Sequence, residues 1–243
     1  IDLATAFTRF LEEDLSDADL DAILSVLADN AHQLQPDSWD TFLAKFRTVM
    51  HTRTLPITTL NIGVRLLCHL AVRGLPCPNP ISESLFTLLR HMRISDEASR
   101  DLFKACEPVF SDPHLDFVHT AAQCIQYFQT HRSTTLQTAV SKAFDLLLAH
   151  MPDDTRGIVF VQVMECGSAC PEVQAIAFKH FSERLSSATA KQLPLFAKAL
   201  LNATRSAKLP ALLQQKIKSC AASLASVPGL DPQLAGELKH ASH

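Results

Sequence analysis

Apolar residues recur along the chain at spacings of three and four, which places them on one face of successive helices. One such face joins Leu60, Val64, Leu67 and Leu70. The β-branched run at residues 158–164 follows the capping sequence PDDT, so a helix is predicted there as well. We expect about thirteen amphipathic helices and no strand. Comparable faces are formed by Leu20, Ile23, Leu24 and Leu27, by Trp39, Leu43, Phe46 and Met50, and by Leu213, Ile217, Cys220 and Leu224.

Prolines and N-capping residues separate these helices at regular intervals. Ser16 and Asp19 form a capping-box arrangement, and Pro56 stands where a first helical turn begins. The first helices of successive pairs are predicted to begin near residues 17, 57, 96, 134, 172 and 210, which are 38–40 residues apart. Their partners are predicted to begin near residues 37, 81, 114, 153, 189 and 231.

A period of 38–40 residues with two helices in each unit is typical of a helical solenoid, in which stacked pairs share one core. The predicted fold class is therefore all-α, as a right-handed α-solenoid of about six helical hairpins. We interpret residues 1–243 as one helical-repeat domain, with a capping helix at 1–14, hairpin repeats at 15–229 and a second capping helix at 230–243. An irregular bundle of antiparallel helices is the alternative.

The composition agrees with a helical globular protein. Hydrophobic residues make up 47% of the chain and charged residues 19%, which is too apolar for a disordered chain. Glycine occurs only 6 times, whereas sheet proteins need glycine in their turns and bulges. The longest apolar stretch, residues 60–72, is interrupted by Asn61, Arg65 and His69 and is shorter than the ~20 residues that span a bilayer. We therefore expect no membrane insertion.

The seven cysteines are odd in number, and most of them lie singly on predicted apolar helix faces. This distribution indicates buried free thiols in a reducing compartment rather than a disulfide framework. The chain begins at Ile1 rather than at methionine, which indicates a trimmed or processed piece.

The predicted repeat units open with an L-[SP]-x-x-x-L pattern, and one of them carries LL-x-x-L-A-x-x-G at Leu66–Gly74. In period and pattern, residues 15–110 resemble organellar helical-repeat proteins of the octotricopeptide and heptatricopeptide type, including those that accompany RAP and FAST-kinase-like domains. HEAT and armadillo arrays share the same pattern. The resemblance implies an RNA-handling or ribonucleoprotein role in a mitochondrion or plastid. Nothing in the chain resembles the compact α/β RAP domain, which argues against nuclease or processing activity.

Charge is unevenly distributed along the chain, although its net value is only −3. Residues 1–40 carry −9 and residues 111–170 carry −3, whereas residues 41–110 carry +4 and residues 171–243 carry +5. The positive regions are candidates for RNA contact, because phosphate contacts supply most of the affinity for nucleic acid. The acidic stretch at 12–22 either begins a solvated helix, where it suits the positive end of the helix dipole, or docks a basic partner.

Two stripes of basic residues have helical phase. One lies on a single predicted helix at steps of four residues, and the other advances in steps of seven residues. In a solenoid such stripes line one surface, where they would bind phosphates or a protein partner; the alternative is ordinary solvated helix faces. The candidate binding residues are Arg65, His69 and Arg73 with Arg90 and Arg93, and Lys191, Lys198 and Arg205 with Lys208, Lys216 and Lys218.

No motif in the sequence indicates catalysis or metal binding. Cys166 and Cys170 are four residues apart, but Pro171 ends the helix there and no second pair completes four ligands. None of the eleven histidines falls in an H-E-x-x-H pattern, and the chain has no G-x-S-x-G and no phosphate-binding glycine loop. The paired carboxylates of Asp153 and Asp154 are explained by N-capping. We expect no catalytic residue, no metal and no cofactor.

These observations predict a non-catalytic helical-repeat protein that binds partners or acts as a scaffold in a mitochondrial ribonucleoprotein or RNA-processing assembly. The expected partners are protein subunits of that assembly and single-stranded RNA, with no small-molecule substrate. The expected location is the mitochondrial matrix, and otherwise the cytoplasm. The alternative is a HEAT/armadillo-like scaffold that contacts only protein, and an enzyme with its active site inside a helical bundle is a third class.

Overall fold

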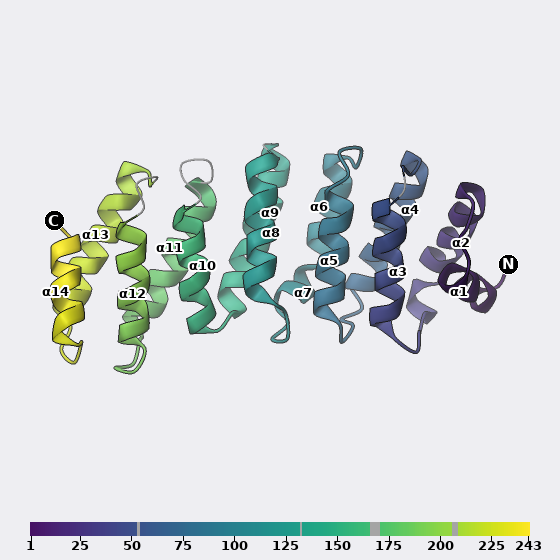
Figure 1. The fold of residues 1–243 in the computed structure, drawn as a ribbon. Helices are drawn as coiled ribbons and strands as arrows, with labels where there is room; N and C mark the ends of the chain where they lie inside the picture. The colour runs from purple at the N-terminus through teal and green to yellow at the C-terminus, as the bar shows by residue number, and fades with distance from the viewer. Residues whose placement is uncertain (53, 132, 166–170, 206–208) are drawn as a thin grey trace. The chain divides into compact units, whose positions relative to one another are not determined.

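The computed structural model describes residues 1–52, 54–131, 133–165, 171–205 and 209–243 (Figure 1). Within these ranges the chain forms fourteen α-helices and one short 3₁₀ helix, and no β-strand, so the prediction of an all-α fold is confirmed. The helices are α1 (Leu3–Glu12), α2 (Asp17–Asp29), η1 (Ala31–Gln33), α3 (Trp39–Thr52), α4 (Ile57–Ala71), α5 (Pro78–Leu89), α6 (Asp96–Ala105), α7 (Glu107–Phe110), α8 (Phe117–Thr130), α9 (Thr134–His150), α10 (Asp153–Glu165), α11 (Pro171–Ser186), α12 (Leu193–Thr204), α13 (Ala211–Ala225) and α14 (Pro232–Ala241).

The observed helix starts lie close to those predicted from the proline and capping residues. α2, α4, α6 and α9 begin at the predicted residues, and α11 and α13 begin one residue away. Successive first helices are therefore 37–40 residues apart. The partner helices deviate more, and α12 begins at Leu193 rather than near residue 189. The short helices η1 and α7 were not among the predicted elements.

Side-chain caps explain several of these starts. Ser16 Oγ accepts a hydrogen bond from the backbone N–H of Asp19 at 3.2 Å, and Ser95 Oγ does the same for Ala98 at 3.1 Å. Each of these bonds satisfies one of the N–H groups that the first turn of a helix leaves without an intrahelical partner. The capping role predicted for Ser16 is confirmed.

The Leu66–Gly74 motif has a structural explanation. Leu66, Leu67 and Leu70 are buried on α4. Gly74, three residues beyond the end of the helix, has a φ of 68°. Glycine adopts this left-handed conformation without a steric penalty, so it lets the chain turn toward α5. Packing and chain reversal therefore account for the apolar and glycine positions of the motif.

The first compact unit comprises Ile1–Asp116 and Ser133–Ala139. Alternate helices pack together in it: α2 contacts α4 and α4 contacts α6, while α3 contacts α5 and α5 contacts α7 (Figure 1). Near its start, Phe7 stacks on Phe42 at 5.7 Å between ring centroids, and Phe10 lies 5.3 Å from the same ring. These aromatic contacts join α1 to α3 and bury apolar surface that one helix could not bury alone.

The second compact unit comprises Phe117–Arg132 and Val140–His243. Here α8 contacts α10, α10 contacts α12 and α12 contacts α14, with α11 and α13 packed beside them. Phe160 of α10 stacks on Phe181 of α11 at 4.1 Å, and Phe181 meets Phe196 of α12 edge-on at 5.2 Å. The β-branched run at residues 158–164 lies within α10, so the predicted helix there is confirmed.

Candidate functional site

The first predicted basic stripe faces the neighbouring helix in the first unit. Arg65 Nη1 lies 2.8 Å from Asp29 Oδ1 of α2. His69 Nδ1 lies 2.9 Å from the carbonyl oxygen of Ala28, and because that oxygen only accepts, Nδ1 carries the proton. Arg73 Nη1 donates to the carbonyl oxygens of Ala31 and Leu34, just beyond the end of α2, at 2.7 and 2.8 Å. All three residues of the stripe therefore bond to the C-terminal region of α2.

The position of these acceptors explains why basic side chains meet them. The last carbonyl groups of a helix have no intrahelical partner, and the C-terminal end carries the negative end of the helix dipole. Side chains with N–H groups supply the hydrogen bonds that these carbonyl groups lack, and a positive charge is attracted to the negative end of the dipole. We call this set of contacts between Arg65, His69 and Arg73 and the C-terminal region of α2 the α2–α4 seam.

Trp39 belongs to the same region. The Arg73 guanidinium carbon lies 5.4 Å from the centre of its ring, and the ring meets Phe42 edge-on at 5.9 Å. The side chain is half-buried rather than fully buried. Trp39 therefore supports Arg73 through a cation–π contact while it packs against Phe42 of the core.

The arrangement recurs where α5 follows α3. His91 Nε2 lies 2.6 Å from the carbonyl oxygen of Met50, near the end of α3, and Arg93 Nη1 donates to the carbonyl oxygen of Leu55 at 2.6 Å. The sequence singled out Arg93 as a candidate ligand contact, but not His91 in this role. Arg90 differs from both, because its side chain is exposed and makes no bond to any described residue.

Arg156 in the second unit is the most buried basic residue of this kind. It is only 1% exposed. Its Nε and Nη2 donate to the carbonyl oxygen of Leu148 at 2.9 and 2.7 Å, and Nη2 also donates to that of Met151 at 2.9 Å. Its Nη1 donates to Asp153 Oδ1 at 2.7 Å. Burial lowers the pKa of Arg156 from its ordinary value, so these acceptors are needed to hold the charge.

The carboxylate of Asp153 has a different role from the predicted N-cap. α10 begins at this residue, and the carboxylate pairs with Arg156 while its second oxygen accepts from Gln192 Nε2 at 2.9 Å. Arg184 Nε lies 3.8 Å away as a further cation. Sequence reasoning missed Arg156, although it shares a helical face with Val159, Phe160 and Val163, which are buried. Its phase with core residues was the available signal.

We call Arg73, His69, His91, Arg93 and Arg156 the basic tethers, because each joins its own segment to carbonyl oxygens at the end of another helix. In four of them the acceptor lies 38–42 residues earlier in the chain, which is close to the 37–40 residues between the starts of successive first helices. Arg156 reaches back only 5 and 8 residues. The tethers account for most of the first stripe without a ligand; ligand contact by these residues stays a prediction.

The second predicted stripe is different, because its members are exposed. Lys191, Lys198 and Arg205 make no hydrogen bond or ion pair to any residue that the structure describes. Lys216 is exposed and Lys218 half-buried on α13, also without such a bond to a described residue. Lys208 lies outside the described residues.

The structure brings Lys198 and Arg205 together in an open groove of about 560 Å³ between α12 and α14. Lys198, Asn202 and Arg205 stand on the α12 side, and Asp231 and Glu237 stand on the α14 side. Leu201, which is 6% exposed, contributes to an apolar floor with Pro194 and Leu234. We call this feature the α12–α14 groove. It carries basic groups on one wall and acidic groups on the other.

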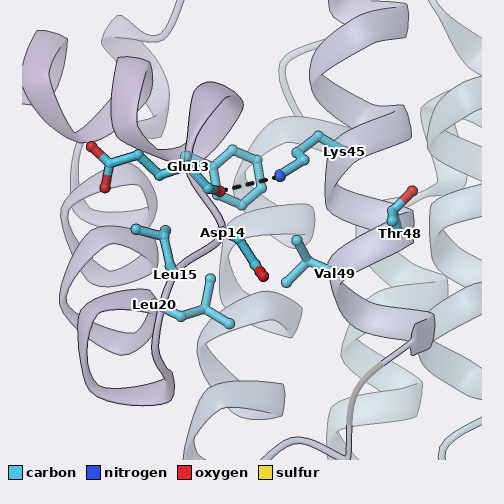
Figure 2. Close-up of a pocket in the computed structure, with 8 residues that line it drawn as sticks. Glu13, Asp14, Leu15, Leu20, Lys45, Thr48 and Val49 are labelled. Atoms are coloured by element: carbon cyan, nitrogen blue, oxygen red, sulfur yellow. Dashed lines mark hydrogen bonds between the residues drawn. The ribbon is translucent and has the colours of Figure 1, made fainter.

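A much smaller cavity of about 80 Å³ lies in the first unit, between the end of α1, the link to α2 and α3 (Figure 2). Lys45 Nζ donates to the carbonyl oxygen of Glu13 at 3.3 Å, while the Glu13 carboxylate turns away and accepts from Arg9 Nε at 2.9 Å. Asp14 extends from the link toward α3, above Leu15 and Leu20 (Figure 2). A volume of this size holds only a few water molecules. The contacts serve the connection between α1 and α3.

The acidic stretch at 12–22 surrounds the start of α2. Asp17 and Asp19 lie in its first turn, and both are exposed, as expected for a solvated helix start that suits the helix dipole. Asp21 accepts a hydrogen bond from the hydroxyl of Thr59 on α4. Docking of a basic partner to this stretch stays a prediction.

The described cysteines are unreactive thiols. Burial raises the pKa of Cys68, Cys77 and Cys220 to about 11 and that of Cys124 to about 12, and it raises the pKa of Cys106 as well. The thiolate is the nucleophile and metal ligand, so these groups are inert near neutral pH. Cys166 and Cys170 lie outside the described residues. In the described part of the chain, no three His, Cys, Asp or Glu side chains gather where they could hold a metal ion.

The fold and its surfaces thus define a class, an all-α protein with helices that pack in alternate order within each unit. None of its described helices has the length and apolar character needed to cross a membrane. Comparison with protein-family models, curated proteins and solved structures finds no match to this chain.

Proposed function

We propose that this chain is a non-catalytic helical-repeat scaffold, a right-handed α-solenoid that binds partner proteins. The observation that carries the proposal is the recurring link between helices one repeat apart. In the first unit, side chains reach acceptors 36–42 residues earlier at five places along the chain. Each of these links joins equivalent parts of neighbouring repeats, which is the contact pattern of a stacked array.

Protein is favoured over RNA as the partner by the state of the basic residues. Arg65, Arg73 and Arg93, which would have to contact phosphates, are bonded within the protein. The free cations Lys198 and Arg205 face an acidic wall, which repels a polyanion. A mixed-charge surface suits a protein segment that carries charges of both signs.

RNA contact is a second candidate, supported by one observation. Lys191, Lys198 and Arg205 are exposed and unpaired with any described residue, as phosphate-binding groups must be before they bind. A ribonucleoprotein role in the mitochondrial matrix follows from the resemblance to organellar repeat proteins and rests on it alone.

Small-angle X-ray scattering tests the solenoid. A compact globule of 243 residues has a radius of gyration of about 18 Å. Six helix pairs stacked at roughly 10 Å spacing form an array about 60 Å long, which raises the radius of gyration to about 20 Å. If a monodisperse sample has a radius of gyration near that of the globule, the chain is not a stacked array and lacks the extended surface that a scaffold needs.

Affinity capture tests the class of partner. The tagged full chain is recovered from a lysate of its own cells, with and without ribonuclease, and the bound proteins and RNA are both quantified. The proposal predicts a defined set of proteins that survives ribonuclease treatment. Recovery of RNA, with proteins that leave when the RNA is digested, would instead support the ribonucleoprotein candidate. The matched control is a variant with Arg90→Glu, which changes an exposed charge outside both the seam and the groove.

A further inference from the structure

We infer that the α12–α14 groove binds an amphipathic α-helix of a partner protein, with acidic residues along one edge of that helix and basic residues along the other. This inference rests on the proposed scaffold function and specifies its site. The groove holds opposite charges that do not satisfy each other. Lys198 and Arg205 form no ion pair with Asp231 or Glu237, although all four residues line the same groove.

The carboxylates of the acidic wall make only long hydrogen bonds within the described part of the protein, so they can still bind a cation of a partner. Asp231 accepts a bond from the backbone N–H of Leu234 at 3.3 Å as the N-cap of α14. Glu237 accepts a long bond of 3.4 Å from Gln233 Nε2. Both acidic residues are exposed, so a cation from a partner can approach either carboxylate. If Asp231 and Glu237 formed ion pairs with Lys198 and Arg205 across the groove, their carboxylates would not be open to a partner.

The spacing of the basic residues selects a helix over an extended strand. Lys198 and Arg205 are seven residues apart, which is two turns of helix and about 10.5 Å along its axis. A partner helix that runs alongside α12 presents residues i and i+7 at the same separation and on the same side. In a strand, about three residues cover that distance, and side chains three residues apart point to opposite faces. A helix therefore matches the separation of the two cations directly, whereas same-face residues of a strand lie about 7 or about 14 Å apart.

The apolar floor supplies the remaining requirement. Leu201 of α12 and Leu234 of α14 line the groove together with Pro194. A partner helix therefore needs an apolar residue between its acidic and basic edges, repeated every three to four positions. This is the helix-in-groove mode of recognition, in which apolar contact supplies affinity and the flanking charges set orientation.

The probe is a synthetic helix of about 21 residues, or three heptads, held helical by side-chain lactam bridges. This helix carries leucine along the face meant for the apolar floor of the groove, glutamate on the edge meant for α12 and lysine on the edge meant for α14. Binding to the full chain is measured by fluorescence anisotropy. The expected result is binding to the wild-type chain that is weakened at least about tenfold by Lys198→Glu with Arg205→Glu, because each new acid faces a glutamate. Circular dichroism melting of the variant should match that of the wild type.

A charge-exchange experiment makes the test specific. The four-residue variant Lys198→Glu, Arg205→Glu, Asp231→Lys and Glu237→Lys reverses both walls. With its apolar face still on the floor, the probe can pair with the reversed walls only if it runs in the opposite direction along the groove. The probe therefore carries a crosslinker at one end, which should react at opposite ends of the groove in the wild type and in the four-residue variant. Equal binding of the probe to wild type and to the double variant, or absence of binding to wild type, would overturn the inference, as would tighter binding of an oligouridylate.

The failure of this inference can be told from the failure of the proposed function. If the Lys198→Glu, Arg205→Glu variant captures the same ribonuclease-resistant proteins as the wild type, the scaffold stands and the groove is not its site. If the wild-type chain captures no such proteins, the scaffold itself is wrong, whatever the synthetic helix does.

Discussion

The α2–α4 seam and the α12–α14 groove are built from the same kind of helix pair, yet their basic residues have opposite fates. In both, alternate helices pack, with cations on one helix and carboxylates on the other. In the seam, Arg65 meets Asp29 at 2.8 Å and Arg73 reaches two carbonyl oxygens beyond the end of α2. In the groove, the charges face each other across open space. Helical phase alone therefore does not distinguish a structural cation from one available to a partner; the acceptors on the facing helix do.

Breaking the most buried tether should have the largest effect on stability. Arg156→Met roughly keeps the side-chain volume but removes the donor to two backbone carbonyl groups, and it leaves the Asp153 carboxylate with Gln192 and the more distant Arg184. Removing one partner of a buried charged pair costs about 3–5 kcal/mol. Urea unfolding followed by circular dichroism should show this loss in the free energy of unfolding. A loss below about 1 kcal/mol would mean that water replaces the guanidinium easily and that the tether is dispensable.

The seam should be the next most sensitive region. Arg73→Met removes two charge-assisted hydrogen bonds and the cation–π contact with Trp39. We expect a loss of about 2–3 kcal/mol. The matched control is Arg90→Met at the end of α5, where no bond to a described residue is lost and the change should stay within about 0.5 kcal/mol. Equal effects of the two substitutions in thermal melts would erase the distinction between tethers and free cations.

The exposed ion pair at the start of the seam should contribute much less. The Arg65 and Asp29 side chains are 45% and 60% exposed. Such pairs contribute less than about 1 kcal/mol, and salt screens them. Arg65→Met should therefore lower the free energy of unfolding only slightly. The difference from wild type should shrink in 1 M sodium chloride, where the Debye screening length falls to about 3 Å. A large, salt-independent loss would place Arg65 among the tethers.

The groove should be the least sensitive region in stability. Lys198→Ala with Arg205→Ala removes no bond to a described residue, so the free energy of unfolding should change by no more than about 0.5 kcal/mol. Equilibrium unfolding of this variant beside Arg73→Met gives the comparison in one experiment. A stability loss as large as that of Arg73→Met would show that these cations also serve the fold.

The sequence was sufficient for the helices and their period, because both depend on local signals. Ser16, Pro56 and the apolar spacing of α4 act within a few residues, and α2 and α4 begin where those signals predict. The short helices η1 and α7 were not predicted, although the proline and glutamate in the first turn of α7 are a local signal of a helix start. Likewise, phase showed that Arg65, His69 and Arg73 share one face, but could not show that this face meets the end of α2.

The candidate site was predictable only in part. Lys198 and Arg205 stood out by their spacing, and the structure confirms that they are exposed and line one groove. The opposite wall comes from Asp231 and Glu237, more than twenty residues later, so only the packing of α14 on α12 brings the two walls together. Arg156 was overlooked although it shares a helical face with buried residues of α10, because sequence reasoning looked for paired side chains and most of its acceptors are backbone carbonyl groups.

The central claim of the proposal is that Arg73 and Arg93 serve the fold, that Lys198 and Arg205 serve a protein partner, and that the described basic residues form no phosphate-binding surface. Filter binding of the full chain to single-stranded RNA at two salt concentrations tests it most directly. The account predicts no retention of RNA even at low salt. Tight retention at low salt that falls steeply with added salt, and that disappears in the Lys198→Glu, Arg205→Glu variant, would contradict it.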